Sequence, residues 1–146
     1  LYRRIKNLMI IALFGAISFN ALAHDLDGIL GPSASASDYY QIQCYDDKQG
    51  AGAARELDLQ LLTMNSAAPV VSMQVSRQET NTVYSATDRA GGDSEPSPSI
   101  VAEHGDGYYY LMINKTLEGV QNYHITYHCV SDAGHAGTEI QSIQSQ

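Results

Sequence analysis

The sequence predicts an all-β fold: a single antiparallel β-sandwich, jelly-roll or immunoglobulin-like, with one disulfide and a cleavable signal peptide before it. Three observations predict it. Apolar and polar residues alternate with a period of two along most of the chain after residue 23, as in half-buried strands. No segment combines a helical apolar stripe with helix caps. The two cysteines, Cys44 and Cys129, both fall on the apolar side of an expected strand.

Residues 1–23 have the three parts of a secretory signal peptide. A basic start with Arg3, Arg4 and Lys6 is followed by an apolar run over residues 8–19, which is too short to span a bilayer comfortably. Ala21 and Ala23 then supply the small residues that signal peptidase requires. We expect cleavage after Ala23, export to the periplasm or the extracellular space, and no membrane anchor.

The expected mature chain is strongly acidic. Three of the eight basic residues and none of the sixteen acidic residues lie before His24, which leaves a net charge of −11 from there onward when histidine is neutral. Nucleic acids and anionic membranes attract basic surfaces, so this charge argues against both as partners. An extracellular polymer or another secreted protein is the expected partner.

Alternation places strands in several segments, and five or more strands with one apolar face each must bury those faces against one another. The clearest segments are 38–44, 56–62, 71–75, 108–114 and 122–129. Short edge strands are expected near 82–86 and 99–102, on either side of a polar loop with Gly91, Gly92 and two prolines. The sandwich domain is predicted to span 37–130, between an N-terminal segment (24–36) and a loose polar tail (131–146) with at most a short strand near Ile140.

Cys44 and Cys129 are expected to form a disulfide, because cysteines in an exported protein are usually paired. Each lies at the C-terminal end of its strand. A bond between the two ends requires the strands to run roughly parallel, either as neighbours or across the two sheets.

Four segments carry a resemblance to a known family. They are Ser37-Asp38-Tyr39-Tyr40-Gln41-Ile42, the strand from Leu57 to Leu61, Gly105-Asp106-Gly107 with the following strand to Ile113, and Asn122 to Tyr127. In this order they resemble the bacterial pre-peptidase C-terminal domain, a jelly-roll sandwich appended to secreted enzymes. The resemblance implies an accessory, binding or secretion-associated role and identifies no ligand. That family's acidic pair before the middle strand is not evident ahead of residues 70–75.

His24 suggests a copper site. With a free amine after cleavage, the amine and the imidazole of His24 could chelate Cu(II), which prefers nitrogen ligands of this kind. The second ligand could come from His104, His124, His128 or His135. His124 and His128 share one strand face but lie about 13 Å apart along it, so only one of these two could join His24.

Two further sites are expected alternatives. Asp25 and Asp27, followed by Gly28, could contribute oxygen ligands to a loop-bound calcium ion. Tyr39, Tyr108 and Tyr110 point outward and could form an aromatic platform for a polysaccharide or a peptide.

The sequence contains no G-x-S-x-G, H-E-x-x-H, phosphate-loop or C-x-x-C motif, so we expect no enzyme. The first interpretation is an accessory or binding module, requiring no cofactor or using calcium. The alternatives are a copper-binding protein and a subunit of an extracellular assembly that pairs through exposed strand edges.

Overall fold

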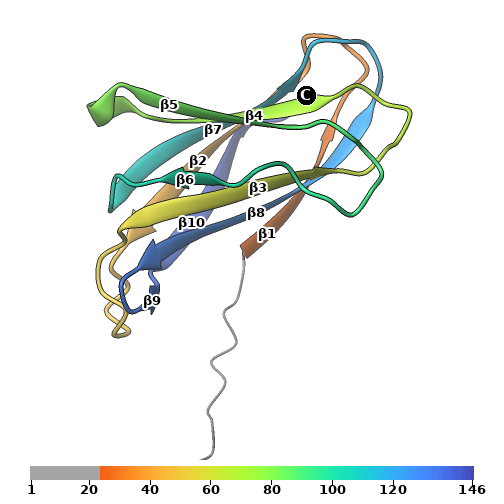
Figure 1. Ribbon diagram of the computed structural model, residues 1–146. Coiled ribbons are helices and arrows are strands. Elements are labelled where there is room, and N and C mark those ends of the chain that lie inside the picture. The colour runs from red at the N-terminus through yellow and green to blue at the C-terminus, as the bar shows by residue number, and fades with distance from the viewer. Residues whose placement is uncertain (1–23) are drawn as a thin grey trace, which may run out of the picture.

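The computed structural model describes residues 24–146, which form two five-stranded antiparallel sheets packed face to face (Figure 1). The predicted β-sandwich is confirmed. Sheet A has the order β1 (His24–Leu30), β8 (Gln121–Ser131), β3 (Glu56–Thr63), β6 (Ile100–Ala102), and β9 (Gly134–His135) also pairs with β8. Sheet B has the order β10 (Gly137–Gln144), β2 (Ser37–Tyr45), β7 (Gly107–Lys115), β4 (Val71–Arg77), β5 (Thr82–Asp88). One 3₁₀ turn, η1 (Gln78–Thr80), joins β4 to β5.

The core lies between the sheets and is formed by the alternating apolar residues of both. Ile42 on β2 and Leu111 on β7 face Leu59 on β3 and Ile125 on β8, and all four are at most 1% exposed. Period-two patterning therefore placed the inward face of these strands correctly. The predicted signal peptide lies outside the described residues. No helix within residues 24–146 has the length and apolar character needed to cross a membrane.

The disulfide joins the two sheets. Cys44 on β2 and Cys129 on β8 are bonded, with their Cα atoms 5.5 Å apart. Near the other end of the same two strands, the hydroxyls of Tyr40 and Tyr123 lie 2.6 Å apart. The strands therefore run roughly parallel across the sandwich, which is one of the two arrangements that the positions of the cysteines allowed.

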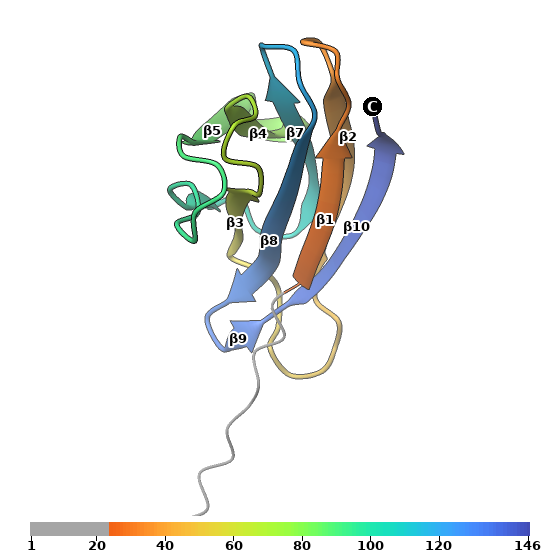
Figure 2. The same cartoon turned by 90° about the vertical axis from the view of Figure 1, so that its right-hand side faces the viewer.

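Both ends of the described chain belong to the sandwich, so the predicted domain boundaries at 37 and 130 were wrong. β1 pairs with β8 along its whole length, and β10 pairs with β2 from Gly137 to Gln144. Figure 2 shows both as edge strands on the same side of the molecule. The polar sequence of β10 hid it, because an edge strand can be fixed by backbone hydrogen bonds to one neighbour while most of its side chains stay in water.

Candidate functional site

The outer face of sheet B is free of charge on four of its five strands. On β2, β4, β5 and β7, none of the outward-facing residues is acidic or basic. They are Ser37, Tyr39, Gln41, Gln43, Tyr45, Ser72, Gln74, Ser76, Val83, Ser85, Thr87, Tyr108, Tyr110, Met112 and Asn114. We call this surface the tyrosine face. On a chain with a net charge of −11 from His24 onward, a neutral face of this extent is a distinct chemical surface.

The three predicted platform tyrosines lie together on the tyrosine face. The rings of Tyr39 and Tyr110 are 6.0 Å apart with planes only 16° from parallel. The side-chain amide of Gln41 donates a hydrogen bond of 3.2 Å to the Tyr110 hydroxyl. Tyr108 precedes Tyr110 by two residues on β7 and is 44% exposed. The strands thus hold aromatic rings and amide groups on one open surface.

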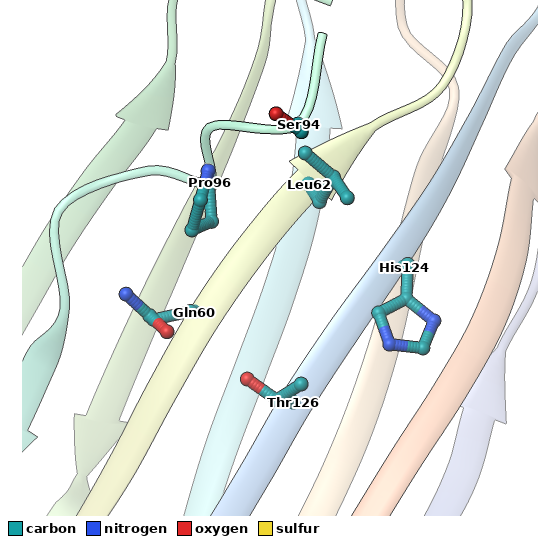
Figure 3. A pocket seen from close by; sticks show the side chains of 6 residues that line it. All are labelled: Gln60, Leu62, Ser94, Pro96, His124 and Thr126. Atoms are coloured by element: carbon teal, nitrogen blue, oxygen red, sulfur yellow. The ribbon is translucent and has the colours of Figure 1, made fainter. Parts of the chain in front are cut away.

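The outer face of sheet A has a different chemistry and is hollowed. Strand register places Asp58, Gln60 and Leu62 of β3 opposite His128, Thr126 and His124 of β8. Two cavities, of about 150 and 210 Å³, lie over these pairs and share Gln60 and Thr126. The first is also lined by Leu62, His124, Ser94 and Pro96 (Figure 3), and the second by Asp58, Leu59, His128 and Ser99. We call this pair of cavities the sheet A groove.

One wall of the groove is the polar loop between β5 and β6, which is fastened to β3. The backbone N–H of Ser97 donates to the carbonyl of Leu61 at 2.7 Å, and the Leu61 N–H donates to the Ser97 hydroxyl at 3.1 Å. Farther along, Gly92 donates to the carbonyl of Thr63. Buried Asp88 accepts hydrogen bonds from both the N–H and the hydroxyl of Thr63. The loop therefore lies along the edge of sheet A and is held there by these hydrogen bonds, although it forms no regular strand.

Two polar atoms in the groove lack partners. Asp58 Oδ1 and His128 Nδ1 are shielded from solvent and have no hydrogen-bond partner among residues 24–146. Burial raises the pKa of Asp58 above its usual value, the nearby charge of Glu56 adds to this, and His128 and Arg55 oppose it. A carboxylate that has lost water without gaining a donor favours a ligand that brings one.

The structure places Asp25 and Asp27 on strand β1, where the calcium hypothesis had expected a loop. Their carboxylates flank His124: Asp27 Oδ1 lies 2.8 Å from His124 Nδ1, and Asp25 Oδ1 lies 3.7 Å from His124 Nε2. Among residues 24–146, no group of three or more histidine, cysteine, aspartate or glutamate side chains could hold a metal ion. The two aspartates therefore partner an imidazole.

Of the four histidines predicted as a second copper ligand beside His24, His135 is the one that lines a cavity with it. It lies opposite Tyr127 in the β1–β8 register, on the side of the sheet that faces inward, and the two rings are 5.7 Å apart. His124 and His128 alternate with inward-facing Tyr127 and point to the opposite side. His135 shares a cavity of about 340 Å³ with His24. His104 instead hydrogen bonds to the hydroxyl of Tyr84.

Sequence reasoning missed the sheet A groove. Alternation identified Asp58, Gln60 and Thr126 as outward residues, but only the register of β3 against β8 shows that they adjoin. No protein-family model matches this chain, and no curated protein matches it significantly. The resemblance to the pre-peptidase C-terminal domain accordingly stays a prediction.

Proposed function

We propose that this protein is an exported, non-enzymatic binding module that binds a neutral polysaccharide on its tyrosine face. The observation that supports this proposal is the uncharged outer face of sheet B, on which Tyr108 is exposed and Tyr39 and Tyr110 are half-buried, in an otherwise acidic molecule. Expected export provides access to such polymers. The resemblance to an accessory domain of secreted proteins agrees with this role.

The chemistry of the face suits a sugar chain. Tyrosine rings offer apolar area on which the C–H side of a pyranose can stack, and they lose little conformational entropy when they do so. Gln41, Gln43 and Gln74 provide amide donors and acceptors for sugar hydroxyls. An uncharged face avoids the large cost of removing water from ions when the polymer covers it.

The test is affinity electrophoresis of the exported protein in gels that contain uncharged soluble polysaccharides such as hydroxyethylcellulose, xyloglucan and laminarin. We expect retardation by at least one polymer. Tyr110→Ala should weaken that binding about tenfold, because it removes a stacking ring from the platform.

His124→Ala is the matched control, because it changes an aromatic side chain on the other sheet, and its retardation should equal that of the wild type. Tyr110→Phe should retain most of the binding, since the ring remains. The proposal fails if no uncharged polymer retards the protein, or if Tyr110→Ala migrates like the wild type.

A further inference from the structure

We propose that the sheet A groove is a second binding site, which takes an extended peptide with a lysine at one end and an aliphatic residue four positions away. The site is separate from the tyrosine face and lies on the other sheet. Its two ends differ in chemistry, and each end selects one of the two side chains.

The polar end selects the lysine. Asp58 and His128 lie opposite each other in the β3–β8 register, and within the described part of the chain Asp58 Oδ1 and His128 Nδ1 are shielded from solvent without a hydrogen-bond partner. Asp58 lines a cavity of about 210 Å³, and because its Oδ1 is shielded, Oδ2 is the one oxygen of this carboxylate that a ligand can reach. A compact ammonium fits a single oxygen better than the planar fork of arginine, which pairs with both oxygens of a carboxylate.

Charge on the surrounding surface agrees with a cationic ligand. Asp25 and Asp27 lie outward on β1 of the same sheet, where the β1–β8 register places them opposite Thr126 and His124. The nearby cation Arg55 is already paired with Glu56 at 2.8 Å and with Asp132 at 3.0 Å. The groove therefore presents negative charge that a lysine-bearing partner would complement.

The apolar end selects the aliphatic residue. Leu62 and Pro96 line the first cavity, and Figure 3 shows Pro96 on the loop at one side of β3 and His124 on β8 at the other. Along β3, Asp58 and Leu62 are four residues apart, a span of about 13 Å. Side chains four positions apart on an extended peptide have the same spacing and point to the same side, so one such peptide reaches both ends.

The middle of the groove favours a peptide over a sugar chain. Gln60 and Thr126, which both cavities share, provide an amide and a hydroxyl that can hydrogen bond to peptide groups. The residues that line the two cavities include no tyrosine or phenylalanine on which a pyranose could stack. Because Ser97 and Gly92 fasten the wall to β3, the groove needs little ordering before it binds.

The test is titration of ¹⁵N-labelled exported protein with two N-acetylated, C-amidated pentapeptides, Lys-Ser-Gly-Ser-Leu and Leu-Ser-Gly-Ser-Lys, followed by amide chemical shifts. We expect one of the two orders to bind in the millimolar range and to shift residues of β3, β8 and the 93–99 loop. Replacing the lysine by norleucine should weaken binding about tenfold or more, because it removes a hydrogen bond to a charged group.

Asp58→Asn should produce a similar loss while keeping the shape of the side chain. Tyr110→Ala on the other sheet should leave peptide binding unchanged, which separates this site from the proposed polysaccharide surface. The proposal is overturned if neither pentapeptide shifts the groove residues, or if the norleucine peptide or the Asp58→Asn protein binds as well as the original pair.

Discussion

At the residue scale, the burial of Asp58 opposes the ionisation of its carboxylate. Its carboxylate is partly buried on the outer face of sheet A, and desolvation raises its pKa. The folded state therefore binds a proton at Asp58 more tightly than the unfolded chain does. The contribution of Asp58 to the free energy of unfolding is most favourable at low pH and declines as the pH rises through the raised pKa.

Asp58→Asn should consequently be at least as stable as the wild type at pH 7, and any gain should vanish near pH 3, where both proteins are uncharged at this position. Thermal melts of the two proteins at both pH values test this, and we expect the melting temperature at pH 7 to rise by a few degrees at most. A clear loss of stability at pH 7 would mean that the carboxylate makes a stabilising contact in the free protein.

Gly28 illustrates a residue whose role only a neighbour explains. In the sequence it follows two aspartates and looks like part of a calcium loop. In the structure a Cβ at this position would lie 2.1 Å from the ring of Tyr123, whose hydroxyl donates to buried Asp38. The glycine leaves space for that ring on the neighbouring strand.

At the scale of the element, β10 decides whether sheet B has a protected edge. Its backbone pairs with β2, the hydroxyl of Thr138 accepts a hydrogen bond from the N–H of Cys129, and the N–H of Gln146 donates to Asp38. Without β10, the long edge of β2 would be open to pairing with other chains.

We therefore expect a chain that ends at Ala136 to melt at lower temperature and to associate, as seen by size-exclusion chromatography with light scattering. Ile143→Ser is the control, since Ile143 is 51% exposed at the irregular end of the strand, and its effect should stay within about 0.5 kcal/mol. A truncated chain that stays monomeric with an unchanged melting temperature would show that β10 contributes little.

At the scale of the whole molecule, the disulfide links strands of different sheets across 85 positions of sequence. Both cysteines are at most 1% exposed. Replacing both by alanine should lower the free energy of unfolding by about 4.5 kcal/mol on the chain-entropy argument. Urea denaturation of the double variant, beside the wild type with and without reductant, measures this difference. Equal midpoints for variant and oxidised wild type would show that the bond adds no stability.

The sequence by itself determined which residues are inward and outward on most strands, the β-sandwich, the pairing of Cys44 with Cys129 and the outward direction of the tyrosines. These properties depend on period-two alternation and on the number of cysteines, and neither requires knowledge of which strands are neighbours. It did not reveal β1 and β10, because edge strands are fixed largely by backbone hydrogen bonds that carry little side-chain pattern.

Only the tertiary structure decided which outward residues adjoin. The register of β3 against β8 places Asp58 opposite His128. The register of β1 against β8 puts His24 and His124 on opposite faces of sheet A. Hydrogen bonds between distant segments hold the 89–99 loop against β3. A shift of one residue in strand pairing would move every side chain to the other face, and the register that prevents it comes from packing across the whole sandwich.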